Sequence, residues 1–414
     1  MKRFLFSLFA ITMVYVNAQV DEHGYKTVEL TTGAAYSNRV FFDLSSENLV
    51  SQNATNWDVA FWRKDMYEFG TRVNDAYGME IYEASANPAD WNAINIANIG
   101  SWGDPLYNPD QTTFLNEGAF EQGSITSSNP NIPATGWGIY NAVNHHIEGK
   151  VIFVMKYPGD VYYKFFIEDY FGGYTFKYAK WNGTSWDATQ TKTIANGSGD
   201  TYFNYFSFTT NDVVANNEPA MGAWDLVFTR YWTFYNNVMM YRMAGVIQSP
   251  DVSIVKKEET QATSTVNLPA DSDYSDVITT IGHSWKPTSG VYDNVVYYIK
   301  QGEDVYRLYF IENGGQANGN MFFKYKKVAG NMSVADVELA KVQVYPNPVV
   351  NQLNVSSESN IKEVKIFSVN GQLVSSVKPN SKSTSVNVSA LKTGVYVAQI
   401  ITDNGVQTAK VIKK

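Results

Sequence analysis

The chain of 414 residues contains no cysteine and only four histidines. Without cysteine the protein forms no disulfide bonds, offers no reactive thiol and has no residue that could carry an N-terminal lipid anchor. Its stability must therefore come from the packing of side chains. If the protein is anchored to a cell surface, the anchor must be at the C-terminal end.

Positive charge is also scarce. The sequence has 32 lysines and arginines against 40 aspartates and glutamates, for a formal net charge of -8. Nucleic acids and anionic membrane surfaces both require clustered positive charge on their partners. The composition therefore argues against either as a partner.

The sequence has one long apolar run, at residues 4–16. It follows Met1-Lys2-Arg3 and precedes Asn17-Ala18. A basic start, a short apolar run and a small residue before the cleavage point are typical of a secretory signal peptide. The run is shorter than the roughly 20 residues that cross a bilayer. We therefore expect a signal peptide at residues 1–18, a mature chain from Gln19 and no transmembrane segment in that mature chain.

Motifs for catalysis are missing as well. The sequence has no Gly-x-Ser-x-Gly elbow, no phosphate-binding glycine loop and no histidines at metal-ligand spacing. Two Trp-Asp pairs, Trp57-Asp58 and Trp224-Asp225, are expected to be structural, because an aspartate at a strand start usually accepts hydrogen bonds from local backbone N–H groups. We predict that the protein is not an enzyme.

Aromatic residues are abundant, with 28 tyrosines, 23 phenylalanines and 10 tryptophans. They occur in short alternating runs that are separated by clusters of Gly, Asn, Asp and Pro. This pattern predicts an all-β protein in which most aromatic side chains belong to the core.

Blocks of the sequence recur in the same order, which indicates an internal repeat. An apolar entry segment followed by a Trp-Asp strand occurs at residues 42–61 and again at 206–228. An apolar strand, a strand that begins Asp-Val-Tyr, and a Phe-Lys-Tyr segment occur at 151–178 and again at 295–325. The recurrence predicts two domains of one topology.

The repeat and the polar stretches around it define the expected organisation of the chain. Superposed, the two repeats should place Trp57 on Trp224 and Tyr162 on Tyr306. The expected parts are a signal peptide (1–18), a first β domain (19–182), a linker (183–200), a second β domain (201–330), a linker (331–341) and a C-terminal domain (342–414).

The C-terminal segment has a pattern of its own, which predicts a small antiparallel β-sandwich with a two-residue hairpin turn at Asn370-Gly371. Three blocks carry it: Tyr-Pro-Asn-Pro at 345–348, Phe-Ser-Val-Asn-Gly at 367–371 and Leu-Lys-Thr-Gly-Val-Tyr at 391–396. In order and spacing they resemble the type A C-terminal sorting domain of the type IX secretion system. The resemblance implies recognition by that machinery, export across both membranes, and either attachment to the outer cell surface or release.

The repeats resemble the HmuY family of secreted heme-binding proteins. Residues 205–208 with 224–231 resemble the entry strands of that family, and residues 137–170 resemble its later half. The resemblance implies two tandem HmuY-like antiparallel β domains that capture heme or bind hemoproteins. The chain departs from the family by carrying two copies and by lacking a cysteine for lipidation.

Heme iron is usually held by histidine or methionine within an apolar pocket. The family places an axial histidine in the loop that contains His145 and His146 here, and Trp137 and Tyr140 flank that loop as expected pocket residues. The alternative for this histidine pair is a solvated loop. The family's other axial histidine has no histidine counterpart in this sequence.

The second repeat offers fewer ligands for heme. His283 lies just before Trp285, and Met239 and Met240 follow the second Trp-Asp strand, although methionines among aromatic residues more often fill a core. Two functions therefore remain open: a surface or secreted binding protein that captures heme, and a structural or adhesive surface protein that has lost heme binding.

Overall fold

The computed structural model describes residues 16–64, 68–127, 135–197, 199–330, 342–368, 372–403 and 405–414. Most of the signal peptide, the expected linker at 331–341 and the expected Asn370-Gly371 turn lie outside these residues. The chain divides into a body (Lys26–Tyr325, with the residues up to Gln19) and a C-terminal unit (Lys326–Lys414, with Val20–Tyr25). The regular secondary structure of both is almost entirely antiparallel strands, so the all-β prediction is confirmed.

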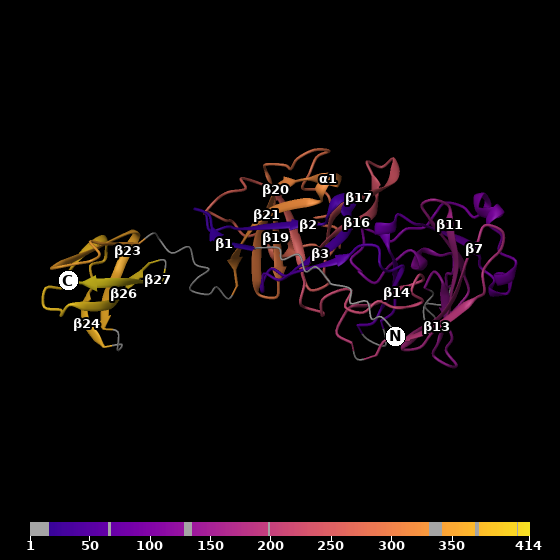
Figure 1. Cartoon of the computed structure of the whole chain (residues 1–414), viewed down its shortest axis with the longest axis horizontal. Coiled ribbons are helices and arrows are strands. Elements are labelled where there is room, and N and C mark those ends of the chain that lie inside the picture. The colour runs from indigo at the N-terminus through magenta and orange to yellow at the C-terminus, as the bar shows by residue number, and fades with distance from the viewer. Residues whose placement is uncertain are drawn as a thin grey trace, which may run out of the picture. The chain divides into compact units, whose positions relative to one another are not determined.

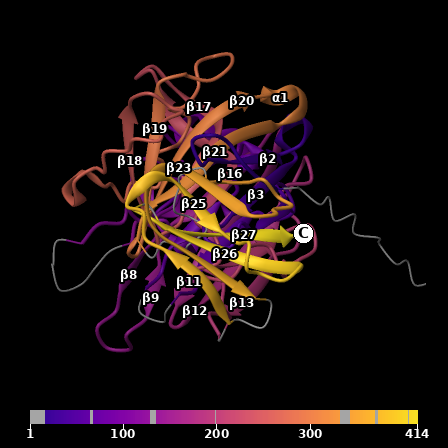
Figure 2. The same ribbon diagram turned by 90° about the vertical axis from the view of Figure 1, so that its left-hand side faces the viewer.

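Over the residues described, the strands of the body form four sheets, and Figures 1 and 2 show their ribbons. A six-stranded sheet has the order β1 (Val16–Val20), β2 (Lys26–Thr31), β21 (Asn320–Ala329), β20 (Asp304–Asn313), β19 (Val295–Gln301) and β18 (Ser253–Glu258). A seven-stranded sheet has the order β13 (Gln190–Ala195), β12 (Gly173–Lys180), β11 (Val161–Tyr170), β10 (Ile152–Tyr157) and β7 (Glu80–Ser85), with β8 (Gly138–Tyr140) and β9 (Ile147–Gly149) at the side.

Two four-stranded sheets complete the body. One has the order β15 (Asp212–Val213), β14 (Phe203–Ser207), β5 (Val59–Trp62) and β6 (Thr71–Val73). The other has the order β17 (Met239–Gln248), β16 (Leu226–Tyr235), β3 (Asn38–Phe42) and β4 (Leu49–Asn53). The helical pieces are all short: α1 (Gly315–Asn318), η1 (Ala34–Tyr36), η2 (Asp75–Tyr77), η3 (Pro88–Asn92), η4 (Ile96–Ser101), η5 (Phe120–Gln122) and η6 (Asp271–Asp273).

Strand pairing groups the sequence differently from the predicted domain boundaries. The N-terminal strands β2 to β4 pair with β21 and β16 from the far end of the body, while β13 to β15 pair with β12 and β5. The body therefore has an inner subdomain (residues 57–213) that is continuous in sequence. It also has an outer subdomain (residues 26–53 and 224–325) that is assembled from both sides of it.

The predicted boundaries at residues 182 and 201 are wrong for this reason. The expected linker at 183–200 contains β13, which is a full edge strand of the seven-stranded sheet. Residues 26–53, which were expected in the first domain, supply three strands to the sheets of the second. A repeat in sequence fixes which strands are equivalent, but it does not say which copy's strands pair with one another.

The two subdomains share one strand order. The path β13-β12-β11-β10-β7 corresponds to β2-β21-β20-β19-β18, and the path β15-β14-β5-β6 corresponds to β4-β3-β16-β17. Each subdomain has its own apolar core, and a third core of mostly aromatic residues lies between the two four-stranded sheets. The inner and outer subdomains are thus two copies of one fold that are joined through their four-stranded sheets.

One expected equivalence is shifted by a residue. Tyr306 faces the outer core, and the inner residue that faces the core at this position is Tyr163, whereas Tyr162 points to the other side of β11. The cause is the preceding turn, which spans residues 158–160 before β11 but only 302–303 before β20. Because side chains alternate along a strand, one extra turn residue moves the aligned tyrosine to the opposite face.

The Trp-Asp aspartates join distant segments of the chain. Asp58 accepts a hydrogen bond from the backbone N–H of Phe208 at 2.7 Å, and Asp225 accepts one from Leu44 at 2.7 Å. These donors lie 150 and 181 residues away. The prediction of a structural role agrees with this geometry, but the expected local partners were wrong. Each aspartate instead holds the entry hairpin of its own subdomain, which lies far away in the sequence.

The C-terminal unit is built around the 17-residue strand β23 (Gln352–Ser368). The first part of β23 pairs with β22 (Gln343–Tyr345) and β25 (Ser381–Asn387), and the second part pairs with β24 (Leu373–Val377) and β26 (Gly394–Thr402), which also pairs with β27 (Gly405–Lys413). The predicted sandwich is therefore one six-stranded sheet that continues through β23.

Two sequence blocks of this unit have clear structural roles. The Asn347 side chain donates to the carbonyl of Lys410 at 2.6 Å and accepts from the N–H of Ile412 at 2.8 Å, so it fastens the Tyr-Pro-Asn-Pro segment to β27. The Tyr396 hydroxyl donates to the carbonyl of Lys392 at 2.9 Å and closes the turn before β26.

Candidate functional site

His145 and His146 lie in the turn between β8 and β9 (Figure 2). The Nδ1 atom of His145 is 2.5 Å from the Tyr140 hydroxyl. The Nδ1 atom of His146 is 2.7 and 2.9 Å from the two carboxylate oxygens of Asp169, and its ring stacks on Phe171 at 4.6 Å with an interplanar angle of 2°. The structure thus places both histidines at the surface, each with its Nδ1 atom engaged.

The two expected pocket residues lie in different environments. Trp137 is 1% exposed, belongs to the inner core and donates its indole N–H to Glu121 at 3.2 Å. Tyr140 is half-buried and its hydroxyl contacts His145. Trp137 is therefore a core residue and cannot line an open pocket beside the histidine pair, whereas Tyr140 can.

The candidates of the second repeat lie around the β16–β17 hairpin. The Nδ1 atom of His283 is 2.8 Å from the Tyr231 hydroxyl, and burial is the main cause that lowers the pKa of His283. Met239 is 57% exposed and pairs with Tyr235, whose ring lies 6.0 Å from that of His283. Met240 is the next residue along β17 and so points to the opposite face of the hairpin. His283 and Met239 share a face, and Met240 is not part of that group.

Within the residues that the structure describes, no group of three or more His, Cys, Asp or Glu side chains is placed to hold a metal ion. Over the same residues, no helix is both long and apolar enough to cross a membrane.

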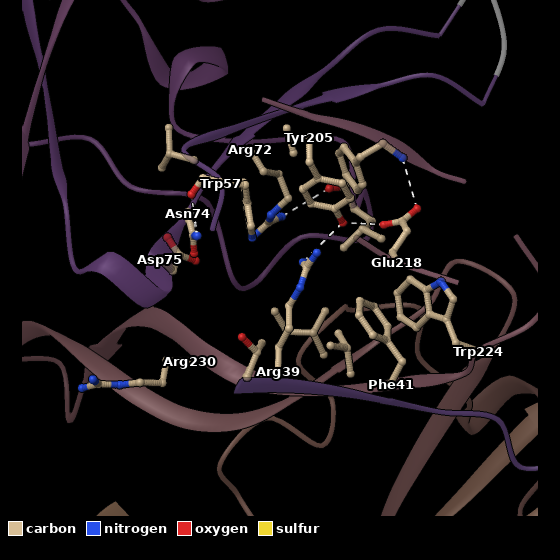
Figure 3. Close-up of a pocket in the computed structure, with 17 residues that line it drawn as sticks. Arg39, Phe41, Trp57, Arg72, Asn74, Asp75, Tyr205, Glu218, Trp224 and Arg230 are labelled. Atoms are coloured by element: carbon tan, nitrogen blue, oxygen red, sulfur yellow. Dashed lines mark hydrogen bonds between the residues drawn. The ribbon is translucent and has the colours of Figure 1, made fainter. Parts of the chain in front are cut away.

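The structure places a cavity of about 70 Å³ between the two four-stranded sheets (Figure 3). Residues at equivalent positions of the two subdomains line the cavity in pairs. Val59 and Leu226 are equivalent because each directly follows Trp-Asp, and the strand registers extend this equivalence to the neighbouring strands. The pairs, one residue from each subdomain, are Trp57 with Trp224, Ala60 with Val227, Tyr205 with Phe41, Phe203 with Arg39, and Arg72 with Ile247. The cavity thus lies where the two copies of the fold meet.

The pairs differ mainly in charge. At two of the five positions one subdomain has arginine where the other has an apolar residue: Arg39 against Phe203, and Arg72 against Ile247. Both arginines are buried, at 7% and 8% exposure. Burying two cations at one interface is costly unless each finds partners.

Arg39 is held mainly by aromatic rings. Its guanidinium lies 4.5 to 5.2 Å from the ring centres of Phe41, Trp57 and Tyr205. It donates to the Tyr205 hydroxyl at 3.3 Å and to the carbonyl of Asn217 at 2.6 Å, and the hydroxyl in turn donates to Glu218 (Figure 3). The hydrogen bond from Arg39 to Tyr205 connects the outer subdomain to the inner one, and a second hydrogen bond continues from Tyr205 to Glu218.

The other charged groups of the cavity are also paired with the backbone or with amides. Arg72 donates to the carbonyls of Leu115 and Glu117 at 3.3 and 3.1 Å. Asp75 accepts from Asn108 at 2.8 Å. Arg230 lines the cavity but extends away from Arg39 (Figure 3).

Sequence reasoning missed this cavity. No motif marks Arg39 or Arg72, since each is a single charge within a short strand. The available signal was the repeat itself. Extending the alignment through the strands would have shown arginine opposite phenylalanine and arginine opposite isoleucine.

Burial controls the ionisation of three carboxyl groups in this region. It raises the pKa of Asp75 to about 6, that of Glu218 to about 7 and that of Asp225 to about 7. At these three carboxyl groups the folded protein therefore binds more protons than the unfolded chain between about pH 4 and pH 7. The stabilisation from these protons is complete below the unfolded pKa values, and it is lost as the pH rises through the folded ones.

We expect the free energy of unfolding to fall as the pH rises from 4.5 to 7.5. A tenfold change in the proton affinity of one group corresponds to about 1.4 kcal/mol, so the three groups together should change the stability by several kcal/mol. Denaturant unfolding at a series of pH values measures this slope. Glu218→Gln and Asp225→Asn should each flatten it, and a stability that rises over this range would contradict the assignment.

Comparison with known proteins identifies the C-terminal unit. Residues 343–414 match the family described as the secretion system C-terminal sorting domain. This domain marks the chain as a secreted cargo of the type IX secretion system, destined for the cell surface or the extracellular space. The resemblance of the repeats to the HmuY family stays a prediction.

Two further comparisons add little. No curated protein matches the sequence. Among solved structures, the chain is similar to PorZ, a bacterial surface component of the type IX secretion system of Porphyromonas gingivalis, at 9% identity and a TM-score of 0.17. The similarity covers 95% of this chain and 58% of the PorZ chain, and at this TM-score it says nothing about function.

Proposed function

We propose that the protein is a non-enzymatic binding protein that the type IX secretion system delivers to the cell surface or the medium. The sorting-domain match over residues 343–414 carries the delivery part of this proposal. A cargo of this system works outside the cell, where the body meets its ligand. Two joined copies of an aromatic-rich β fold are suited to holding a ligand on a rigid scaffold.

Heme is the ligand that the sequence favours, with His145 or His146 as the iron ligand. Metal-ligating histidines commonly use one ring nitrogen for the metal and the other for a hydrogen bond to a carboxylate or another polar group. His146 has this arrangement with Asp169, and His145 has it with Tyr140, which leaves the Nε2 atom of each ring for iron. This hydrogen bonding supports the proposal.

The aromatic surroundings fit heme only in part. A pocket for a ligand of this size needs about 300 Å³ or more, so the cavity of about 70 Å³ between the sheets cannot hold it. With Trp137 in the core, Tyr140 and Phe171 are the rings beside the histidine pair that would cover a porphyrin. Heme would therefore bind at the surface of the inner subdomain, on the β8–β9 hairpin.

The competing function is a structural or adhesive surface protein that keeps the fold but binds no heme. Heme titration of the mature protein, followed by the Soret band, separates the two. We expect a saturable Soret shift that is lost when His145 and His146 are both replaced by alanine, with an unchanged circular dichroism spectrum.

The matched control is His283→Ala, which removes the candidate ligand of the outer subdomain and should leave the Soret shift intact. Binding that survives the double substitution would exclude this site. If the parent protein itself gives no saturable shift, the structural or adhesive function replaces heme capture.

A further inference from the structure

The end of the hairpin formed by β16 and β17 is exposed and apolar. The two strands pair along all ten residues of each (Figure 1). The neighbouring strand β3 pairs with β16 only at residues 226–228, so within the described residues no third strand lies beside residues 231–241. Four large apolar side chains at this end are half exposed or more: Tyr241 at 51%, Phe234 at 54%, Met239 at 57% and Val238 at 75%. Single exposed apolar residues are ordinary, whereas a cluster of them marks an interaction site.

The apolar side chains surround the tip of the hairpin. Phe234 and Met239 lie on opposite faces, because Phe234 pairs with Met240 whereas Met239 pairs with Tyr235, the next residue along β16. Val238 is in the turn between the two strands. A flat protein surface can cover only one of the two faces, whereas a fluid environment can enclose the whole tip.

The area of the tip argues against a second copy of the chain as the occupant. An aromatic side chain buries roughly 150–250 Å², so four side chains of this size or somewhat smaller, each about half exposed, present on the order of 400 Å². A stable dimer buries roughly 800 Å² on each partner. The tip therefore supplies about half of the surface that such an interface requires.

The charge of the hairpin differs from that of the whole chain. Residues 231–241 contain no charged residue, and the complete hairpin (226–248) contains two arginines, Arg230 and Arg242, but no aspartate or glutamate. The chain has a formal net charge of -8, so long-range attraction does not bring it to an anionic surface. The hairpin nevertheless has no negative charge of its own that lipid phosphates would repel.

We propose that the tip of this hairpin, residues 234–241, inserts into the interfacial region of a phospholipid bilayer. Aromatic side chains are favourable at this depth, where one end of a tyrosine ring is in an apolar environment and the other is in water. The uncovered backbone edges of β16 and β17 require water or lipid headgroups as hydrogen-bond partners, so the tip does not enter the centre of the bilayer. This contact depends neither on heme nor on the sorting domain.

Flotation of the mature protein with neutral phosphatidylcholine vesicles tests the proposal, at low salt and in about 1 M NaCl, where the Debye length is about 3 Å. We expect the protein to float with the vesicles under both conditions, because apolar insertion does not depend on charge. Phe234→Ser and Met239→Ser should each weaken binding about tenfold, since each removes an apolar side chain from the inserted tip without adding charge. The double variant should not float.

Phe114→Ser is the matched control. Phe114 is 65% exposed, like the residues of the tip, but it lies in a loop whose turn ends at Glu117 and not in an apolar cluster. This substitution should leave vesicle binding unchanged. Because all the replaced side chains are largely exposed, the circular dichroism spectrum and melting temperature of each variant should match those of the parent.

Three results with vesicles would overturn the proposal: a parent protein that does not float, flotation that is lost in about 1 M NaCl, or tip variants that both float like the parent. Sedimentation without vesicles examines the alternative occupant. If the parent is a dimer and the double variant is a monomer, the tip is an interface between copies of the chain, and membrane insertion is refuted.

Discussion

A chain that ends at residue 341 is expected to fold its body normally and to remain in the periplasm. The sorting domain occupies residues 343–414, and the C-terminal unit has its own apolar core, which includes Leu353, Ile366 and Ile400. Removing it takes no strand from the four sheets of the body. Delivery should therefore be lost completely while the fold is retained.

Cell fractionation with detection of the body measures the first effect, and circular dichroism of the purified truncated protein measures the second. A milder control is Asn347→Ala, which removes the two hydrogen bonds between the Tyr-Pro-Asn-Pro segment and β27 but keeps the rest of the domain. We expect this variant to be delivered less efficiently than the parent. Normal surface delivery of the truncated chain would refute the role given to this domain.

The second large effect concerns which fragment of the body can fold by itself. A fragment of residues 19–182 contains every block of the first sequence repeat, yet it should fail to fold. It lacks β14, which pairs with β5, and it loses Phe206 and Phe208 from the inner core. Removing a large buried aromatic side chain costs about 3–5 kcal/mol, and two such losses approach the 5–15 kcal/mol that stabilises a typical domain.

A fragment of residues 54–222 has nearly the same length and should fold, because it contains the complete inner subdomain. The two fragments are compared by cooperative unfolding in denaturant and by the dispersion of their NMR spectra. The strand assignment predicts a sharp transition for residues 54–222 alone. A cooperative transition for residues 19–182 would show that the entry hairpins pair within their own repeat instead.

Much of the fold follows from sequence patterns. The alternating aromatic runs predict the strands, and the recurring blocks predict two copies of one fold, because both signals are local. The pairing of β3 with β16 is not local, and nothing in residues 38–42 distinguishes the Trp-Asp strand of one copy from that of the other. The subdomain boundaries therefore required the structure.

At the candidate site, too, local features are readable from the sequence and contacts between distant segments are not. The loop position of His145 and His146 is readable from the sequence, whereas their contacts with Asp169 and Phe171 come from a neighbouring hairpin. Trp137 reads as a pocket residue by its place in the sequence, but packing against Tyr174 and a hydrogen bond to Glu121 place it in the core. Arg39 is marked in the sequence only by an extended alignment of the repeats, and its contacts with the rings of Trp57 and Tyr205 come from the structure.

The two-part outer subdomain sets the order in which the protein can be assembled. A nascent chain emerges from its N-terminus, so β2 to β4 are made first, but their partners β16 and β21 are among the last strands of the body. Until then, side chains such as Val40 and Phe42, which are fully buried in the finished protein, have no sheet to join. The inner subdomain can fold as soon as residue 213 has emerged. The strands β2 to β4 are thus synthesised first but are the last to pair. The fold is complete only when nearly the whole body has been synthesised.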